Sequence, residues 1–549
     1  MNLVNILDKH ALLQPHHIAL RDCHAGLDRA ITYQTLQKHT TTTARRLIES
    51  GLKKGDRVLL LVPLSVETYV LLLAIFRIGA VAVIADSSFG LNMLRRSLSL
   101  VQPDAMISNS RIRTFANVFS EIRNIPLKLN VHHIVSIDGT SFETRTTNGA
   151  TQTEAEVQEF DRDHPALITF TSGSSGTPKA IVRTHGFLLQ QQKVLASSLP
   201  GQKNDVELTT LPVFVLSALA QGITSVLPDC NMRRPGSIDA NRIVNQLKRC
   251  SVNRIIASPA FLQRLSNHLQ DEKAQLPRVQ NILTGGGPVF PSLLKLAESV
   301  FPNAEINSVY GSTEAEPIAH VSSREMSKAD LEKTFAGGGL LAGRPINEIE
   351  LAIVDPAELN TFARNGGNRK FNRLPANTTG EIVVRGKHVI KTYLNGQGDA
   401  ETKLRAHGSK IWHRTGDAGY LDDQGRLWLM GRCALKISDA KGDLYPFQVE
   451  VAASELQSVR RATCLETDGK RILIVEKKHR TPLRWFVDLF KQFDLSRHTA
   501  PFSRTIGDAF TWLRFDEIRY VYSMPVDARH NSKIQYGKLE RSLKARIVL

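Results

Sequence analysis

The chain has 549 residues, of which 42% are hydrophobic and 22% charged, and it carries a formal net charge of +17. This length exceeds what one hydrophobic core usually serves, so two or more domains are expected, and the hydrophobic content excludes a chain that is disordered throughout. The Lys and Arg residues are spread along the chain rather than gathered in a block, so no specific nucleic-acid partner is expected.

The first residues contain no basic segment followed by an apolar run, so no signal peptide is expected. The most apolar segment, residues 58–85, is interrupted by Pro63, Glu67, Arg77 and Gly79 and falls short of the ~20 uninterrupted apolar residues that span a membrane. Five scattered cysteines without a CxxC pair indicate a reducing compartment, with neither a disulfide framework nor a zinc site. We therefore expect a cytoplasmic protein without a transmembrane segment, for which peripheral membrane contact stays open.

Short apolar runs alternate with segments of helical spacing over the first part of the chain. Strands are expected at residues 58–64, 80–86, 166–171, 254–258, 280–287 and 305–311, and helices at residues 67–79, 243–250 and 291–301. This alternation is typical of parallel sheets that are covered by helices.

The pattern changes after about residue 345. Short strands are expected at residues 349–355, 380–386, 426–432 and 471–478, with turn residues between them. The polar segment 357–379, rich in Asn, Gly and Arg, is expected to be a surface loop. A long helical section is expected from residue 481 onward.

The stretch FTSGSSGTPK, residues 170–179, is rich in small and hydroxyl-bearing residues. Glycine and serine let the backbone approach a ligand closely, and successive N–H groups in such turns bind anions. Lys179 adds a compact positive charge, so the stretch could hold a polyphosphate, and a plain glycine-rich turn is the alternative. It is not the common P-loop, because Ala180 follows Lys179 where that motif has a magnesium-binding Ser or Thr.

This stretch resembles the phosphate loop of the AMP-forming acyl-adenylating superfamily, which includes acyl-CoA synthetases, luciferases and the adenylation domains of peptide synthetases. Five further segments resemble parts of that superfamily and follow its order. They are residues 55–86 (an early strand, helix and strand), TGGGPV (284–289), NSVYGSTE (307–314), GEIVVRGKHVIKTYL (380–394) and WHRTGDAGYLDDQGRLWLMGR (412–432). The resemblance covers most of the chain.

The resemblance implies an α/β fold with two domains. Residues 1–431 would form a large N-terminal adenylation domain of several subdomains, with parallel-rich sheets covered by helices. Residues 432–434 would form a hinge, and residues 435–549 a smaller, mobile α+β domain that carries the catalytic lysine.

The resemblance also implies roles for individual residues. It assigns the β- and γ-phosphates of ATP to Thr171, Ser172, Gly173, Ser174, Ser175, Gly176, Thr177 and Lys179. It assigns adenine and ribose to Gly286, Gly287, Pro288, Tyr310, Gly311, Asp417 and Arg432. Thr313 would contact the α-phosphate, and Glu314 would hold Mg²⁺, a cation that prefers oxygen ligands.

The C-terminal domain of the superfamily turns about a hinge that usually carries Asp or Lys, and here Ala434 stands at that position. The catalytic lysine would be Lys533, in the sequence NSKI after Pro525, with Lys538 as the alternative. Such a lysine would neutralise charge between the substrate carboxylate and the α-phosphate.

Two features concern the substrate. Residues 525–534, PVDARHNSKI, resemble the tail of the β-lactone synthetases of olefin biosynthesis, which adenylate a long-chain β-hydroxy acid. Phe214 and Val215 stand where many acyl-CoA synthetases have Phe-His, which favours an apolar acyl pocket that would include Gly285 and Ser312. Residues 211–222 contain no Asp or Glu that could pair a substrate ammonium, so amino-acid activation is disfavoured.

The sequence thus indicates an AMP-forming ligase of fatty-acid metabolism that converts an apolar-tailed carboxylic acid and ATP to acyl-AMP and pyrophosphate. Coenzyme A is expected first as the acceptor, because it is the common acceptor of the superfamily. Closure of a β-hydroxy acyl-AMP to a β-lactone is the second hypothesis. A non-catalytic nucleotide-binding homologue is the third, and the intact Lys179, Glu314, Asp417 and Lys533 argue against it.

Overall fold

The computed structural model describes most of the chain. It covers residues 2–24, 26–85, 90–110, 119–135, 159–172, 178–232, 234–364, 371–406, 410–456, 458–478, 510–527 and 533–544. Two predictions lie outside these residues: the phosphate contacts of Gly173, Ser174, Ser175, Gly176 and Thr177, and the start of the helical section expected from residue 481.

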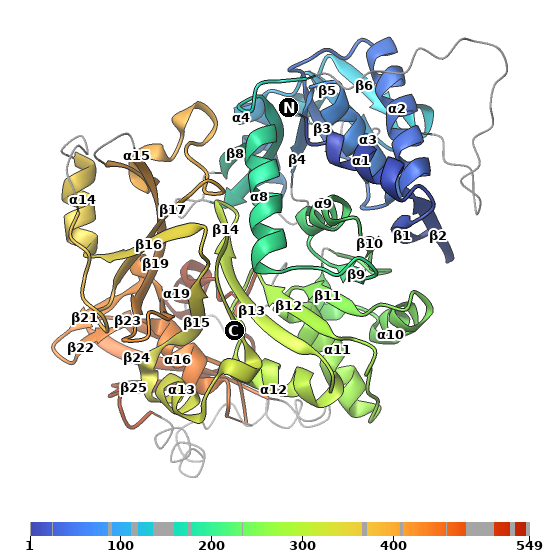
Figure 1. Ribbon diagram of the computed structural model, residues 1–549. Helices are drawn as coiled ribbons and strands as arrows, with labels where there is room; N and C mark the ends of the chain where they lie inside the picture. Colours follow the sequence, from blue (N-terminus) through green and yellow to red (C-terminus); the bar gives the residue numbers. More distant parts are fainter. Residues whose placement is uncertain are drawn as a thin grey trace, which may run out of the picture.

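A six-stranded sheet lies in the N-terminal part of the molecule (Figure 1). In sheet order its strands are β6 (Leu127–Asn130), β5 (Ala105–Ser108), β3 (Arg57–Leu61), β4 (Val81–Ile84), β7 (Pro165–Ser172) and β8 (Pro178–Thr184). Neighbouring strands are parallel except β7 and β8, which pair antiparallel on either side of the glycine-rich stretch. The expected strand, helix and strand of residues 58–86 are therefore confirmed.

A fourteen-stranded sheet runs through the remainder of the large part of the molecule. Its parallel strands, in sheet order, are β13 (Glu305–Ser312), β12 (Asn281–Gly285), β11 (Arg254–Ala257), β9 (Val206–Thr209), β10 (Thr224–Val226) and β1 (Ile18–His24), with the antiparallel edge strand β2 (Leu27–Thr32). The strands predicted at residues 254–258, 280–287 and 305–311 are confirmed as β11, β12 and β13.

The other half of this sheet is antiparallel and begins at the hairpin of β13 and β14 (Ala315–Ser322). It continues through β15 (Leu340–Pro345), β20 (Leu427–Arg432), β19 (Lys410–Leu421), β17 (Gly380–Gly386) and β16 (Ile349–Val354), and β18 (Lys403–Ala406) pairs with β19. The mixed α/β architecture expected from the sequence is confirmed.

Helices cover both sheets. In chain order they are α1 (Asn5–Leu13), α2 (Tyr33–Glu49), α3 (Val66–Arg77), α4 (Leu91–Val101), α6 (Ser120–Arg123), α7 (Val131–Ile134), α8 (His185–Ser198), α9 (Pro212–Gln221), α10 (Ala240–Arg249), α11 (Pro259–Asp271), α12 (Pro291–Val300), α13 (Lys328–Lys333), α14 (Pro356–Arg364) and α15 (Asp399–Thr402). Helix α8 begins where Thr184 accepts a hydrogen bond from the Phe187 N–H, which satisfies an end group of the helix. No helix among the described residues has both the length and the hydrophobicity needed to cross a bilayer.

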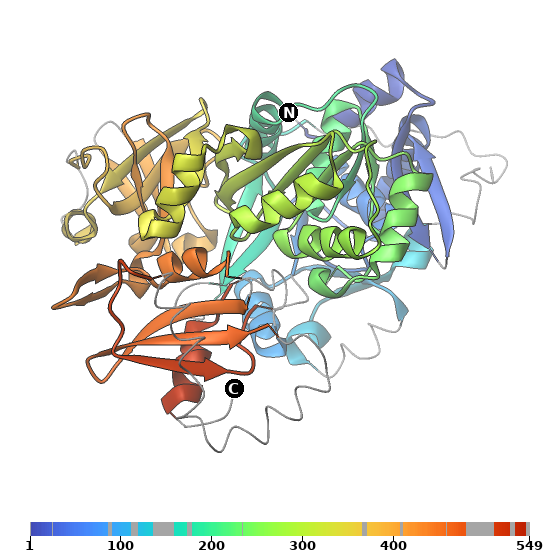
Figure 2. The ribbon, with the colours of Figure 1, turned by 90° about the horizontal axis from the view of Figure 1, so that it is seen from below.

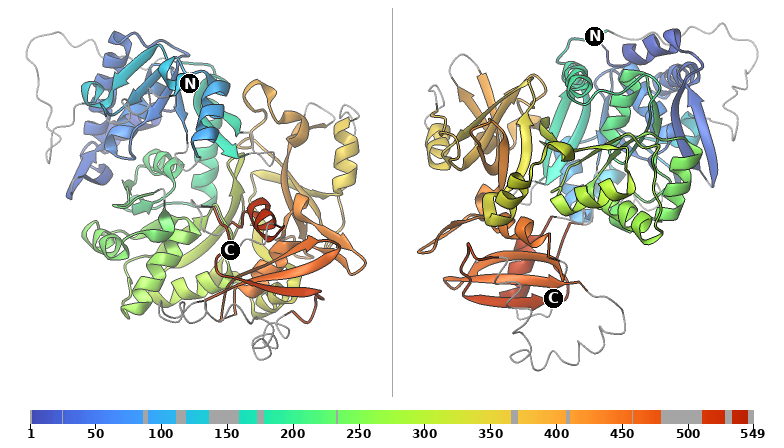
Figure 3. Two further views of the ribbon diagram at one scale, coloured as in Figure 1. Left: turned by 180° about the vertical axis from the view of Figure 1, so that it is seen from behind. Right: turned by 60° about the horizontal axis from the view of Figure 1, so that its bottom comes forward.

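A separate three-stranded sheet lies at one edge of the molecule (Figures 2 and 3). Its strands are β23 (Val459–Thr467), β24 (Lys470–Lys477) and β25 (Glu517–Val521), and it is accompanied by α16 (Pro446–Ala453), α19 (Tyr536–Lys544) and a hairpin of β21 (Ile437–Asp439) and β22 (Gly442–Leu444). It meets the large part of the molecule at Gly337, whose carbonyl accepts a 2.7 Å bond from Gln448 Nε2. A Cβ at Gly337 would lie 2.5 Å from the Trp512 ring, so the contact requires glycine.

Two expectations about single elements are wrong. The segment expected as a loop at residues 357–379 begins within α14, because Pro356 at the first helical position and Glu358 in the first turn favour a helix start. Residues 517–521 are strand rather than helix, because they form a parallel ladder with β24. Tertiary pairing of this kind is not visible in the local pattern.

Candidate active site

The turn between β13 and β14 brings Glu314 to the end of the β7–β8 hairpin. Glu314 Oε1 accepts a 2.8 Å hydrogen bond from the hydroxyl of Tyr393 and a 3.5 Å contact from Thr171 Oγ1. Tyr393 is buried, and its burial beside the Glu314 carboxylate raises the pKa of the phenol, so it stays a neutral donor. The structure therefore joins two residues predicted for phosphate and metal binding, from strands far apart in the sequence.

Lys179 lies against the same tyrosine. Its ammonium is 5.4 Å from the centroid of the Tyr393 ring, a cation–π distance. Gly398 lets the lysine pass, because a Cβ there would lie 2.7 Å from Lys179 Cε. Gly398 also has φ +101°, which a larger residue rarely adopts.

A second, buried lysine lies on the other side of this cluster. Lys403 Nζ is 5.0 Å from the Tyr393 ring centroid, donates to the Ile390 carbonyl at 2.6 Å and lies 3.1 Å from His413 Nδ1. Burial lowers the pKa of Lys403 to about 8, although the carboxylates of Glu314 and Asp399 oppose that shift. Burial also lowers the pKa of His413 well below its ordinary value, so the imidazole is neutral and can accept from the ammonium.

Arg183 fixes the turn that carries Thr313 and Glu314. Its guanidinium is 4% exposed and donates to Thr169 Oγ1 at 2.5 Å and to the Thr313 carbonyl at 2.8 Å. One side chain thus holds the end of β7 and the predicted α-phosphate contact in a fixed relation. No role was expected from the sequence for Arg183, Tyr393, Lys403 or His413, although Tyr393 is the Tyr of KTYL and His413 the His of WHRTGD in the quoted motifs.

The residues predicted for adenine and ribose also meet. The Tyr310 hydroxyl donates to Asp417 Oδ2 at 2.8 Å, and Arg432 lies 3.2 Å from Asp417 Oδ1. Burial next to Asp417 raises the pKa of Tyr310 well above its ordinary value. A carboxylate has about four acceptor positions, so Asp417 keeps capacity for further donors such as the two hydroxyls of a ribose.

The glycine segment after β12 has a close-packed backbone. A Cβ at Gly285 would lie 2.5 Å from the Val309 carbonyl oxygen, and Gly286 has φ +79°. Gly287 and Pro288 follow in the same bend, and Gly311 lies opposite, near the end of β13. These glycines keep one face of the β12–β13 strand ends free of side chains.

The residues predicted for the acyl pocket divide between two hydrophobic clusters. Phe214 packs with Leu195, Leu199, Ile256 and Leu283, where α8 and α9 meet the ends of β11 and β12. Val215 belongs to the large N-terminal core instead. Ser312 lies at the end of β13, and its buried Oγ has no hydrogen-bond partner among the described residues.

The predicted catalytic lysine lies in the small part of the molecule. Lys533 is exposed, and its backbone exchanges two 3.0 Å hydrogen bonds with Asp527, one of them to the carboxylate. Lys538 lies in α19, and Ala434 is exposed in the short turn of residues 433–435. The roles of Lys533 and Ala434 stay predictions.

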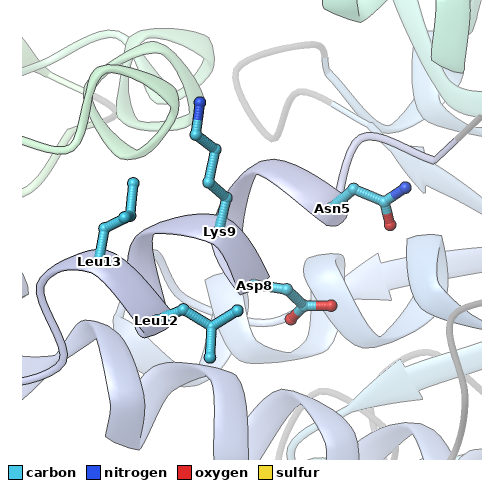
Figure 4. Close-up of a pocket in the computed structure, with 5 residues that line it drawn as sticks. All are labelled: Asn5, Asp8, Lys9, Leu12 and Leu13. Carbon is cyan, nitrogen blue, oxygen red and sulfur yellow. The ribbon is translucent and has the colours of Figure 1, made fainter.

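Two further features concern other possible ligand sites. Among the described residues there is no group of three or more His, Cys, Asp or Glu side chains that could hold a metal ion, so Glu314 is the single protein carboxylate predicted for magnesium. A surface pocket on α1, lined by Asn5, Asp8, Lys9, Leu12 and Leu13, contains none of the residues discussed above (Figure 4).

Comparison with known proteins places these motifs in context. Residues 7–394 match the family model described as AMP-binding enzyme. The chain is 30% identical to an olefin beta-lactone synthetase of Stenotrophomonas maltophilia over 98% of this chain and 97% of that protein. It is 27% identical to the 4-coumarate–CoA ligase of Vanilla planifolia over 74% of this chain and 71% of that protein. Among solved structures, the O-succinylbenzoate coenzyme A synthetase of Bacillus subtilis in complex with ATP and magnesium superimposes with a TM-score of 0.70 at 21% identity, covering 98% of this chain and 99% of that one.

Proposed function

The chain belongs to the family of AMP-binding enzymes and is an AMP-forming ligase, and we propose that it makes a β-lactone from an apolar-tailed β-hydroxy acid. In the first step a carboxylate oxygen attacks the α-phosphorus of ATP, and pyrophosphate leaves. In the second step the hydroxyl oxygen of the same substrate attacks the acyl carbon, AMP leaves, and the hydroxyl proton passes to the AMP phosphate or to solvent.

One observation carries the choice of acceptor. The similarity to an olefin beta-lactone synthetase spans nearly the whole of both chains, whereas the match to the coumarate ligase covers 74% of this chain. The tail from Pro525 to Ile534 and the uncharged hinge residue Ala434 support the same choice. Coenzyme A, expected first from the sequence, becomes the second candidate, which the similarity to a CoA ligase supports.

The cluster around Glu314 would bind the triphosphate. Lys179, Thr171 and Ser172 would contact the β- and γ-phosphates together with the glycine-rich stretch. Both protein donors to Glu314 bond Oε1, so its other oxygen would hold Mg²⁺, which typically binds through one or two carboxylates plus phosphate oxygens. Bound there, the ion would neutralise phosphate charge.

The pair of Tyr310 and Asp417 would bind the nucleoside. The face of the β12–β13 strand ends that Gly285 and Gly286 leave free of side chains gives adenine a flat approach. Asp417 already accepts from Tyr310 and is paired with Arg432, so its orientation is set before the ribose arrives. Thr313, whose carbonyl Arg183 fixes, would then lie beside the α-phosphate.

Lys533 would supply the last charge. Displacement at phosphorus needs little covalent work from the protein, and alignment and neutralisation of charge provide most of the rate. A lysine between the carboxylate and the α-phosphate would do both. In the second step the nucleophile is tethered to the acyl group, and effective molarities of ~10⁵ M or more can replace a site for a second substrate.

The experiment uses purified protein, ATP and magnesium with long-chain acids that carry or lack a 3-hydroxyl, each with and without coenzyme A. Products are identified by mass spectrometry as acyl-AMP, lactone or thioester. We expect lactone from the hydroxy acid without coenzyme A, and bound acyl-AMP from the unsubstituted acid. Rapid thioester formation without any lactone would instead support coenzyme A as the acceptor. No pyrophosphate from any acid would favour a non-catalytic nucleotide-binding protein.

A further inference from the structure

Gln192 on α8 is a buried glutamine whose amide lacks partners. It is 4% exposed, and among the described residues neither its Oε1 nor its Nε2 has a hydrogen-bond partner. The adjacent Gln191 is buried as well, and its Oε1 also has no partner among the described residues, whereas two other buried glutamines differ. Gln246 accepts from the Asp229 N–H at 2.9 Å and donates to the Leu227 carbonyl at 3.0 Å, and Gln448 likewise bonds backbone groups through both amide atoms. A buried amide without hydrogen bonds lowers the stability of the folded protein. We therefore expect Gln192 to gain a hydrogen-bond partner when substrate is bound.

The face of α8 that carries Gln192 borders the predicted acyl pocket. Leu188, Gln192, Leu195 and Leu199 follow one another at spacings of three or four residues and so lie on one face of the helix. Leu188 packs in the same core as Val215, and Leu195 and Leu199 pack with Phe214. Gln192 therefore lies at the junction of the two clusters that contain the predicted pocket residues.

Two contacts allow an estimate of which residues of β13 lie level with Gln192. Arg183 in β8, two residues before the start of α8, bonds the Thr313 carbonyl, and Leu195 in α8 shares a cluster with Val309. Later positions in α8 thus correspond to earlier positions in β13. Three helical residues rise about 4.5 Å and a strand rises about 3.3 Å per residue, so going back from Leu195 to Gln192 corresponds to about one to two residues beyond Val309.

That estimate places Gln192 level with Tyr310 and Gly311, close to Ser312. Ser312 Oγ is itself buried without a partner among the described residues. By this estimate two polar groups without described partners lie near the strand end that carries Thr313, the residue predicted to contact the α-phosphate, and the cluster that contains Leu195 and Phe214 beside them is hydrophobic. A substrate whose carboxylate lies at Thr313 would bring its first few carbons past this point.

We propose that Gln192 binds the hydroxyl of the hydroxy acid and thereby selects that substrate class. This inference rests on the proposed function. A hydroxyl both donates and accepts, so one such group could accept from Nε2 and donate to Oε1 of the same amide. An unsubstituted acid would leave the amide unpaired, and sites built to bond a hydroxyl discriminate strongly against analogues that lack it.

Gln192 acts here as a positioning residue. A hydroxyl held at its amide lies on the acyl side of the α-phosphate, where the oxygen must be for attack on the acyl carbon. The amide cannot remove the proton itself, because a neutral amide is not a base in this range of pH. Its contribution is selection and orientation.

The test compares wild type with Gln192→Met, a change to an apolar side chain of similar length. Both proteins receive ATP, magnesium, and either a 3-hydroxy acid or the unsubstituted acid of the same length, and pyrophosphate release gives kcat/KM for each. We expect the preference for the hydroxy acid to fall at least tenfold in Gln192→Met. The matched control is Gln246→Met, which removes a bonded buried amide and should change both rates by one common factor.

An unchanged preference in Gln192→Met, with both acids adenylated, would overturn the inference and leave the proposed function standing. A wild type that adenylates neither acid would overturn the proposed function itself. If Gln192→Met does not fold, Gln192→Leu and Ser312→Ala provide the same comparison, and a preference that survives in both would overturn the inference as well.

Discussion

The predicted nucleotide site and the predicted catalytic lysine lie in regions of opposite character. Around Tyr310, Glu314 and Asp417, side chains from distant parts of the chain are bonded to one another, and these three residues are partly buried. Lys533 is an exposed residue in a short segment whose backbone pairs with Asp527. One region is assembled before substrate arrives, whereas the other provides a side chain with local backbone support.

This difference agrees with the two roles in the proposed reaction, ATP binding by one region and catalysis by the lysine of the other. Binding ATP rewards groups whose orientation is set in advance, because less ordering entropy is lost on binding. A lysine that must move into the site for the adenylation step cannot be locked in place by buried contacts. Substitutions in the assembled region should therefore alter ATP binding or stability, and substitution of the lysine should alter the rate.

Lys533→Ala should have the largest effect. Loss of one preorganised charge contact in the transition state commonly costs ~10²–10³ in rate, so acyl-AMP formation should fall by that factor while ATP binding stays nearly unchanged. Pyrophosphate release and equilibrium ATP binding are the two measurements. Lys538→Ala, in the neighbouring helix, is the matched control. If Lys538→Ala loses the rate and Lys533→Ala keeps it, the assignment belongs to Lys538.

The buried Lys403 should make the free energy of unfolding depend on pH. A folded pKa of about 8 against an ordinary 10.5 corresponds to about 3 kcal/mol. Between pH 8 and 10.5 the unfolded chain holds the extra proton, so stability rises with pH there, and below pH 8 this group contributes no slope because both states are charged. The free energy of unfolding of wild type relative to Lys403→Met should therefore increase by about 3 kcal/mol from pH 7.5 to pH 10.5.

Urea unfolding at pH 7.5, 9 and 10.5 gives this difference directly. Lys538→Met is the control, because it removes an exposed lysine outside the buried cluster around Tyr393. A difference between wild type and Lys403→Met that is flat across this range would show that the amine keeps an ordinary pKa. Water would then reach the cluster around Tyr393 more readily than its contacts indicate.

Asp417→Asn should weaken ATP binding more than chemistry. Asp417 Oδ2 faces the Tyr310 hydroxyl and Oδ1 faces Arg432, so an asparagine must turn its NH₂ toward one of two donors. Loss of a charged acceptor typically costs about 1.5–3 kcal/mol, which corresponds to a rise of at least about tenfold in KM for ATP. Pyrophosphate release as a function of ATP concentration measures it, with the exposed Asp423→Asn as control. An unchanged KM would remove Asp417 from the ribose site.

The sequence predicted these two regions unequally, for physical reasons. Strands β11 to β13 are short apolar runs between helices, and a short apolar run of this kind is typical of a buried strand. Glu314 and Asp417 stand in segments that resemble motifs of a known superfamily, and that resemblance implied the roles predicted for them. Lys403 and Gln192 could not be found in this way, since a lysine or glutamine in a polar sequence context is usually exposed.

What makes these two residues unusual is set by contacts between distant segments. Lys403 is buried because β18 pairs with β19 and lies against Tyr393. Arg183 acquires its role only when the β13–β14 turn brings Thr313, 130 residues away in sequence, to its guanidinium. The same holds for β25, whose strand form depends on pairing with β24 across the chain segment before it.

The smallest effect is expected at the predicted hinge, where a substitution tests how the two regions are joined. Ala434 is exposed in the turn of residues 433–435, directly after Arg432, which is tied to Asp417. Exposed substitutions usually stay within about 0.5 kcal/mol, so Ala434→Asp should change acyl-AMP formation by no more than about twofold. A β-hydroxy acid that closes on itself needs no second domain arrangement, so lactone formation should be equally unaffected, and quantitative mass spectrometry of both products measures this. If Ala434→Asp instead produced a large gain in thioester formation with coenzyme A, a charged pivot would be the missing element of a thioester-forming ligase, and the join between the two regions would decide the acceptor.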